Sequence, residues 1–319
     1  MPNLTPTPAG FRPTVIYNGP SAGGTGKTQN VITLAAILRL AGHEVLLVDA
    51  DPTTRGLQAK LPQHVLRFAS GSAEIEAECD KLLDTARDKA FVLIDAGAAA
   101  LQQPMLIEAL TLSLDTFTTA GFRCVLALSL VANKGGLARD ITRFRRVFGP
   151  AAELFTLLTA ASGTAGFAPY DDALAGLPRI PVPRLSPALV ELSTYEGRPL
   201  DEVVTSPPTG LKRAAALLAQ HLVQVAVQPA VTGLLGIAPP LAHLRELADD
   251  RPHHWFPNIE RISGLHDRAL EADAAFLHAL NTLCRLDQAT DDDAVLTAAR
   301  MLMGAHRSRT EAASAGSLS

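Results

Sequence analysis

The segment Ser21–Thr28, with the sequence SAGGTGKT, constrains the fold of this chain more than any other feature. It follows a short apolar run at 14–17 and precedes a helical pattern in which Val31, Leu34 and Leu38 recur on one face. A strand, a glycine-rich turn and a helix in this order are the context that a phosphate-binding loop requires. The glycines let successive backbone N–H groups point at one anion, and the helix start adds a partial positive charge. The segment therefore predicts a phosphate site.

Two side chains at the end of this loop carry the predicted chemistry. Lys27 is placed to reach the outer phosphates of a nucleotide, and the Thr28 hydroxyl is placed to hold Mg²⁺. A glycine-rich turn containing Gly-Lys-Thr by chance is the other interpretation, but the flanking strand and helix favour the phosphate loop. The residues predicted to contact the nucleotide here are Gly23, Gly24, Thr25, Gly26, Lys27, Thr28 and Gln29.

The loop departs from the general pattern GxxxxGK[ST], which has glycine where this chain has Ser21. The string AGGTGKT at 22–28 resembles the deviant phosphate loop KGGxGK[ST] of the ParA/MinD ATPases. This resemblance implies that the chain binds ATP and Mg²⁺ and forms a nucleotide-dependent homodimer. The signature lysine of the family, which reaches the phosphates of the dimer partner, falls at Ala22 and is absent here. Its loss removes a positive charge where negative charge develops, so hydrolysis is slow, is rescued by another cation, or is missing.

Two aspartates at the ends of apolar runs complete the predicted site. Asp51 lies in the segment VDADP at 48–52, which resembles the DxDP segment in which ParA-like proteins orient or activate the attacking water. An ordinary strand-end turn is the alternative, since Asp-Pro commonly starts turns. Asp95 ends the apolar run at 91–94 and resembles a Walker B carboxylate that binds Mg²⁺ directly or through water. The predicted metal-site residues are Thr28, Asp51 and Asp95, and the predicted catalytic residues are Asp51 and Lys27.

The hydrophobic pattern of the chain predicts its fold class. Continuous apolar runs, rather than alternating ones, are typical of strands that are covered on both faces. Strands that alternate with helices predict an α/β fold with a doubly wound, mostly parallel sheet. Ligands of such sheets bind at the carboxyl ends of the strands, so Asp49, Asp51 and Asp95 are expected beside the phosphate loop. The expected strands are 14–17, 45–49, 91–95, 124–130 and 154–159, and the expected helices include 29–40, 73–86 and 136–148.

Composition shifts predict four parts of the chain. A Pro/Thr-rich flexible arm at 1–12 precedes a ParA-like ATPase domain at 13–227, and a helical extension at 228–306 precedes a disordered Ser/Ala-rich tail at 307–319. In the extension, apolar residues recur at spacings of three and four from Ile262 to Leu283, which indicates one face of a long helix. Such a stripe is a packing face, either within the chain or against a protein partner.

A later segment extends the resemblance to about residues 12–226. The sequence RIPVP at 179–183 resembles the family segment that borders the adenine base, which implies that Pro181 contacts the nucleotide. The string DAGA at 95–98 and the missing signature lysine are similar to the small StbB-like plasmid-stability and conjugation ATPases. Gly97 is expected to let this switch segment move when the γ-phosphate leaves.

A basic stripe at 139–146 has two interpretations. Arg139, Arg143 and Arg146 lie opposite an apolar stripe on one expected helix, so they are either a solvated face or a surface that contacts DNA phosphates. Three arginines neutralise about three phosphates, which predicts weak, salt-sensitive binding without base readout.

The bulk composition limits the possible partners and compartment. A net charge of −4 gives no global attraction to nucleic acid, so any such contact needs a local patch. The three cysteines are far apart and show no metal or disulfide spacing, which favours a reducing cytoplasm. The expected tail lacks a basic amphipathic anchor, so no membrane partner is expected.

The sequence leaves several functions open. The first is a ParA/MinD-like ATP-binding switch in DNA segregation, plasmid stability or conjugative transfer. The second is a nucleotide-sensing scaffold with little or no hydrolysis, which the residue Ala22 supports. The third is a metabolic P-loop enzyme such as a kinase or an amidoligase, which would need an acceptor pocket for which no motif is evident.

Overall fold

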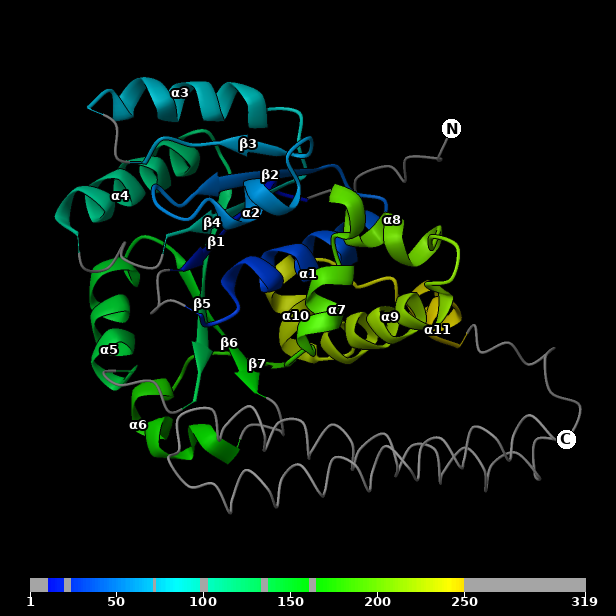
Figure 1. Cartoon of the computed structure of the whole chain (residues 1–319). Helices are drawn as coiled ribbons and strands as arrows, with labels where there is room; N and C mark the ends of the chain where they lie inside the picture. The colour runs from blue at the N-terminus through cyan, green and yellow to red at the C-terminus, as the bar shows by residue number, and fades with distance from the viewer. Residues whose placement is uncertain are drawn as a thin grey trace, which may run out of the picture. The chain divides into compact units, whose positions relative to one another are not determined.

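A computed structural model describes residues 11–19, 24–70, 73–97, 103–132, 137–160 and 165–249. Within these residues, seven strands form one sheet in the order β3-β2-β4-β1-β5-β6-β7 (Figure 1). Every neighbouring pair in this sheet is parallel. The strands are β1 (Thr14–Gly19), β2 (Val45–Ala50), β3 (Val65–Arg67), β4 (Phe91–Ala96), β5 (Arg123–Val131), β6 (Glu153–Ala160) and β7 (Arg179–Pro183).

Helices connect these strands and cover both faces of the sheet. The longer helices are α1 (Lys27–Leu40), α3 (Ile75–Ala86), α4 (Pro104–Thr119), α5 (Leu137–Phe148) and α9 (Lys212–Ala226). The shorter ones are α2 (Gly56–Lys60), α6 (Asp171–Leu174), α7 (Pro187–Leu192), α8 (Leu200–Thr205), α10 (Pro229–Leu235) and α11 (Leu241–Asp249), with 3₁₀ turns at Ala165–Tyr170 and Tyr195–Gly197.

Two apolar cores lie on opposite faces of the sheet, because successive side chains of a strand point to opposite sides. In β1, Ile16 packs in the core shared with α1, α8 and α9, whereas Val15 and Tyr17 pack in the core shared with α3, α4 and α5. Figure 1 shows these two groups of helices on either side of the strands. The predicted doubly wound, parallel α/β fold is confirmed.

The five predicted strands are confirmed as β1, β2, β4, β5 and β6, and the three predicted helices as α3, α5 and the body of α1. Two edge strands were not expected. β3 has only three residues, and β7 contains Pro181 and Pro183. Proline is tolerated at a sheet edge, where one N–H need not join a ladder.

The start of the expected C-terminal extension packs into the same body as the sheet. Val231, Leu234 and Leu235 of α10 and Leu244 of α11 are completely buried in the core that contains α1 and α9. The rest of the extension, the tail at 307–319 and residues 1–10 of the predicted arm lie outside the described residues.

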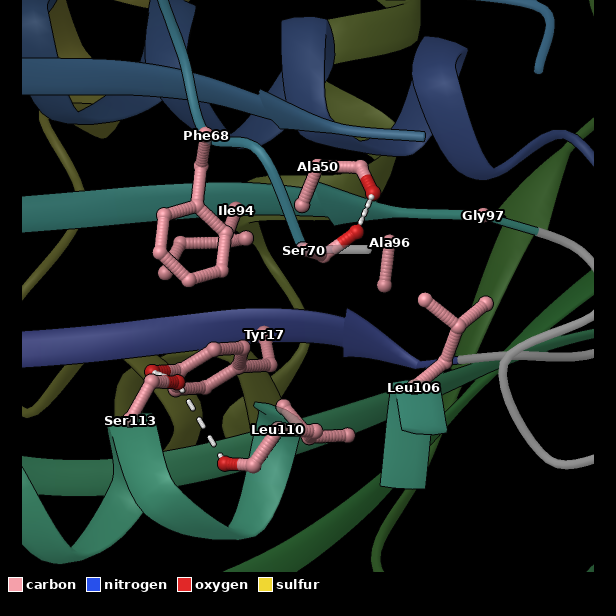
Figure 2. A pocket seen from close by; sticks show the side chains of 10 residues that line it. All are labelled: Tyr17, Ala50, Phe68, Ser70, Ile94, Ala96, Gly97, Leu106, Leu110 and Ser113. Atoms are coloured by element: carbon pink, nitrogen blue, oxygen red, sulfur yellow. Dashed lines mark hydrogen bonds between the residues drawn. The ribbon is translucent and has the colours of Figure 1, made fainter. Parts of the chain in front are cut away.

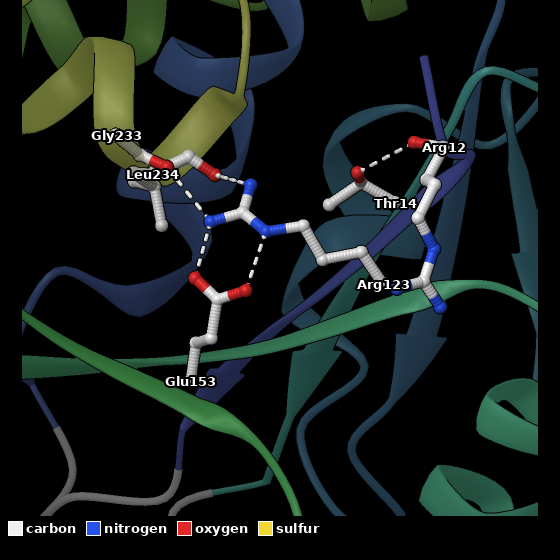
Figure 3. A network of polar contacts seen from close by, with 6 residues as sticks. All are labelled: Arg12, Thr14, Arg123, Glu153, Gly233 and Leu234. Atoms are coloured by element: carbon white, nitrogen blue, oxygen red, sulfur yellow. Dashed lines mark hydrogen bonds and ion pairs between the residues drawn. The ribbon is translucent and has the colours of Figure 1, made fainter. Parts of the chain in front are cut away.

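An arginine from β5 holds α10 in place (Figure 3). Arg123 donates two hydrogen bonds to the Glu153 carboxylate, at 2.8 and 2.5 Å. It also donates to the carbonyls of Gly233 and Leu234, at 2.8 and 3.1 Å. These carbonyls belong to the last turn of α10, where no intrahelical donor remains, so Arg123 ties the helix end to the amino-terminal edge of the sheet.

Among the described helices, none alone is long and apolar enough to cross a membrane. Only α9 and α10 taken together, across an 85° bend, reach the required length and composition.

Candidate nucleotide site

The end of the predicted phosphate loop has the backbone conformation that glycine permits. Gly24 and Gly26 have φ angles of 72° and 81°, in the left-handed region that side chains other than glycine rarely adopt. Gly26 is the N-cap of α1, and Lys27 and Thr28 form its first turn. Gly23 and the neighbouring Ala22 lie outside the described residues. The N–H groups at a helix start have no acceptor within the helix, which is the feature that an anion site uses.

Thr28 and Asp95 lie in direct contact at this helix start. The hydroxyl Oγ1 of Thr28 donates a hydrogen bond of 2.6 Å to Oδ2 of Asp95, the residue that follows four apolar residues of β4. Asp95 is only 3% exposed. The fold thus brings together two of the three predicted metal-site residues, one from the phosphate-loop helix and one from a strand end.

The second carboxylate oxygen of Asp95 shows that the site suits a cation. Oδ1 is buried and has no hydrogen-bond partner, which is costly for an ionised carboxylate. Burial, helped by the charges of Asp49 and Asp51, raises the pKa of Asp95 to about 7, although the Thr28 hydrogen bond and the charge of Lys27 lower it. A divalent cation would offset this cost. Among the described residues, no group of three or more His, Cys, Asp or Glu side chains could hold a metal by itself. A Mg²⁺ ion here would therefore depend on phosphate oxygens as further ligands, as Mg²⁺ sites commonly do.

Asp51 lies on the adjacent turn, but its carboxylate is engaged by its own loop. Oδ1 accepts hydrogen bonds from the backbone and the hydroxyl of Thr53 and from the backbone of Thr54, and Oδ2 accepts from the Thr54 hydroxyl at 2.6 Å. Burial raises the pKa of Asp51, but these hydrogen bonds outweigh it and leave the pKa below its usual value. A Cβ atom on Gly97 would lie 3.2 Å from Oδ1 of Asp51, so these two residues, which follow β4 and β2, lie next to each other.

Asp49 holds this turn together, a role that the sequence did not indicate. Its Oδ1 accepts from the N–H of Asp51 at 3.0 Å, and its Oδ2 accepts from the N–H of Gln58, in α2, at 2.8 Å. α2 also approaches the site, since a Cβ atom on Gly56 would lie 3.3 Å from Oγ1 of Thr28. An aspartate two residues before another is a common turn pattern, so only the tertiary structure separates the two roles.

The other two predicted nucleotide contacts are Gln29, on α1, and Pro181, on β7. Gln29 accepts a hydrogen bond from the hydroxyl of Ser193, at 3.2 Å, while its Nε2 is buried with no partner. Pro181 is on β7, and its carbonyl accepts from Nε2 of Gln228 at 2.6 Å. β7 is three strands from β1 in the sheet order, a spacing of about 14 Å. Pro181 thus lies on an edge strand of the sheet.

The arginine stripe lies on α5. The buried residues of α5 are Leu137, Ile141, Phe144 and Phe148, whereas Arg139 and Arg146 are exposed and Arg143 is half-buried. Arg145, on the same helix, instead donates to the carbonyls of Ala173 and Ala175 near the end of α6. The predicted stripe is therefore accessible, and one neighbouring arginine has a structural role.

A cavity lies on the opposite face of the sheet from α1 (Figure 2). It is mainly apolar, and its polar groups are bonded to the protein: Ser70 donates to the carbonyl of Ala50 at 2.8 Å, and Tyr17 and Ser113 share a hydrogen bond. No charged side chain is among its described lining residues, so it has no group to bind a carboxylate or phosphate of a second substrate.

Several solved structures resemble this chain. MinD from Pyrococcus horikoshii, complexed with Mg-ADP, is 18% identical, with 70% of this chain and 98% of that chain covered and a TM-score of 0.45. The MinC:MinD complex of Aquifex aeolicus is 15% identical, with coverages of 72% and 98% and a TM-score of 0.45. Cobyrinic acid a,c-diamide synthase from Mycobacterium smegmatis, with bound ADP and magnesium, is 18% identical, with coverages of 58% and 97% and a TM-score of 0.40. Identities this low assign no substrate or activity to the chain.

The sequence itself matches one family model. No curated protein sequence is significantly similar to the chain. The model of the CobQ/CobB/MinD/ParA nucleotide-binding domain matches residues 21–265, which is more than half of the 319 residues. The match begins inside the phosphate loop and includes Thr28, Asp51 and Asp95. The chain therefore belongs to the CobQ/CobB/MinD/ParA family of nucleotide-binding domains.

Proposed function

We propose that this protein binds ATP and Mg²⁺ at the first turn of α1 and acts as a ParA/MinD-like switch in DNA segregation, plasmid stability or conjugative transfer. The observation that carries the proposal is the contact of Thr28 with Asp95, whose second oxygen is buried without a partner. A hydroxyl and a carboxylate beside a glycine-rich helix start are the protein side of a Mg²⁺–triphosphate site. The bound ion would neutralise charge on the phosphates; Lys27 and the backbone N–H groups would hold and orient them.

The switch would run through two neighbouring segments. Asp51 and Gly97 lie next to each other, and they follow the paired strands β2 and β4. An ordered γ-phosphate would therefore bias both segments together and present a surface for a second copy or a protein partner. We also propose that the protein belongs to the StbB-like branch and has a deviant phosphate loop with Ala22 in place of the signature lysine. It would bind a protein partner through residues 228–306 and would be cytoplasmic.

Nucleotide titration tests the site. Lys27→Ala is expected to abolish binding of a fluorescent ATP analogue, because the lysine charge is lost from the phosphates. Lys81→Ala on α3, at an exposed position, is the matched control and is expected to bind as the wild type does. Unchanged affinity in Lys27→Ala would refute the site. Light scattering with ADP and with a non-hydrolysable ATP analogue then measures whether the triphosphate drives dimerisation.

A nucleotide-sensing scaffold with little or no turnover is the second candidate. Both carboxylate oxygens of Asp51 are already occupied by Thr53 and Thr54, and Ala22 supplies no cation. Against the effect of burial, these hydrogen bonds lower the pKa of Asp51, which makes it a weaker general base for an attacking water. Equal ATPase rates in the wild type and Asp51→Ala, with and without DNA, would favour the scaffold, whereas a loss of rate in the variant would favour the ATPase.

Contact of the protein with DNA is the remaining part of the proposal. Arg139, Arg143 and Arg146 lie on the accessible side of α5 and fit the phosphates of a nucleic acid without base readout. The net charge of −4 confines any such attraction to a local patch of this kind.

A further inference from the structure

A buried asparagine in the central strand binds the backbone of the phosphate-loop helix. Asn18 is fully buried near the end of β1, in a strand whose other residues are mostly apolar. Its Nδ2 donates a hydrogen bond of 2.6 Å to the carbonyl of Lys27, the first residue of α1. The side chain of β1 thus reaches the helix turn that carries Lys27 and Thr28.

The same asparagine is held from its other side by a neighbouring strand. Oδ1 of Asn18 accepts from the hydroxyl of Ser129 on β5, at 2.7 Å. The Ser129 oxygen in turn accepts from Nδ2 of Asn30, at 2.8 Å, and Asn30 belongs to the first turns of α1. The hydrogen bonds therefore leave α1 at residue 27, pass through two strands and return to α1 at residue 30.

These hydrogen bonds of Asn18 and Ser129 lie next to the carboxylate of Asp95. Asn18 and Asp95 are direct partners in the parallel register of β1 and β4, so their side chains share one face of the sheet. Thr28 bonds to Asp95 on β4, Lys27 to Asn18 on β1, and Asn30 to Ser129 on β5. Three adjacent strands each hold one residue of the same helical turn.

We infer that Asn18 and Ser129 are positioning residues of the nucleotide site, which fix the start of α1 relative to Asp95. The inference rests on the proposed ATP site. An apolar side chain of the same size would fill the space but would let the helix rotate or slide, because dispersion contacts are not directional. Hydrogen bonds from two strands allow one register, and a small error in that register separates Thr28 from the carboxylate with which it would share a metal ion.

The test compares variants of Asn18 and Ser129 with a matched variant on the other face of the sheet. Asn18→Leu removes both hydrogen bonds of the asparagine side chain and keeps its number of non-hydrogen atoms, and Ser129→Ala removes one hydroxyl and is the milder change. Ser113→Ala, whose buried hydroxyl bonds to Tyr17 in the opposite core, controls for a general loss of stability. Affinity for Mg-ATP is measured well below each melting temperature, together with hydrogen exchange of the amides at 27–31 in the nucleotide-free protein.

We expect Asn18→Leu to weaken Mg-ATP binding by about tenfold and Ser129→Ala by a few-fold, since each loses two buried hydrogen bonds but only Asn18→Leu loses the direct bond to Lys27. Exchange at 27–31 should rise in both. Ser113→Ala should bind within about twofold of the wild type, because its lost bond is remote from the helix start. Wild-type affinity in a folded Asn18→Leu would overturn the inference and leave the proposed function standing. If Asn18→Leu does not fold, wild-type affinity in Ser129→Ala would overturn the inference instead. Failure of the wild type to bind Mg-ATP would instead overturn the proposed function and, with it, this inference.

Discussion

Thr28 and Asp95 are 67 residues apart in the chain, yet their side-chain oxygens are 2.6 Å apart at the start of α1. The carboxylate that accepts this bond has a second buried oxygen with no partner. A bound cation would give this oxygen a partner and offset the cost of the buried charge.

The first prediction concerns the charge of Asp95. Asp95→Asn keeps the shape of the side chain but removes the negative charge that a Mg²⁺ ligand needs. We expect ATP affinity in excess Mg²⁺ to fall by about tenfold or more, as for other charged hydrogen-bonding groups at buried sites. Affinity in EDTA should change little. Calorimetric titration under both conditions measures the difference, and an equal loss with and without Mg²⁺ would speak against a metal role.

The second prediction concerns the pH dependence of His221. This histidine is buried between α9 and α1, where Nε2 lies 3.3 Å from the hydroxyl of Thr33 and Nδ1 has no partner. Burial lowers its pKa from 6.5 to about 4. The unfolded chain therefore binds the proton first as pH falls, so His221 contributes stability above pH 6.5 that is lost towards pH 4. The full effect is roughly 3 kcal/mol. In His221→Leu this loss should vanish. Denaturant unfolding should therefore show that the free energy of unfolding of the variant, relative to that of the wild type, is higher at pH 4.5 than at pH 7.

The third prediction is the opposite pH effect of Asp95. Burial raises its folded pKa from 3.8 to about 7, so the nucleotide-free protein gains stability from the protonated form below pH 4 and loses it as pH rises through 7. Asp95 and His221 therefore act in opposite directions over much of the same window. Each is visible only as a difference between a variant and the wild type. Without nucleotide, the free energy of unfolding of Asp95→Asn minus that of the wild type should be larger at pH 8 than at pH 5. A smaller difference at pH 8 would contradict a raised pKa of Asp95.

The fourth prediction concerns Arg123, which donates to a carboxylate and to two carbonyls at the end of α10. Arg123→Ala should lower the free energy of unfolding by about 1–3 kcal/mol, because two carbonyls at the end of α10 and the Glu153 carboxylate lose a charged donor. Arg123→Lys should recover only part of this loss, since an ammonium group cannot present the same planar set of donors. Glu153→Gln should have a smaller effect, because the Glu153 side chain is half exposed. Urea unfolding of the three variants gives the order.

The fifth prediction concerns the basic face of α5. The double variant Arg139→Gln/Arg146→Gln should weaken binding to DNA of any sequence and reduce the slope of log affinity against log salt by about 1.8. The control Lys81→Gln/Arg87→Gln makes the same change in net charge on exposed positions of α3 and its C-cap. Equal salt slopes in the two variants, measured by fluorescence anisotropy, would show that the α5 arginines are an ordinary solvated face.

Much of the fold was predictable because its cause is local. β1, β2, β4 and β5 are continuous apolar runs, and only strands buried on both faces require that pattern. β3 escaped prediction because three residues carry no period, and β7 because its prolines argue against a strand except at an edge. Which strands form the edges is a property of the whole sheet.

Some roles of the polar residues were also predictable from local motifs, and others were not. The sequence marked Asp95 and Thr28 because each stands in a recognisable motif, and the fold then placed them in contact. It did not mark Asn18 or Ser129, because one polar residue inside an apolar strand has no periodicity or spacing that a reader of the sequence can use. Gln29 was predicted from the phosphate-loop pattern and Pro181 from a resemblance; in the structure Gln29 contacts Ser193 at the end of α7, and Pro181 lies on β7.

The sequence by itself determined the glycine-rich turn and most of the succession of strands and helices along the chain. Both follow from neighbouring residues: glycine conformations, helix starts and apolar runs. Only the tertiary structure decided which polar side chains meet. The contacts of Asp95 with Thr28, of Asn18 with Lys27 and of Arg123 with α10 depend on strand order and register. These properties arise when distant segments bury their apolar faces together, and no local pattern encodes them.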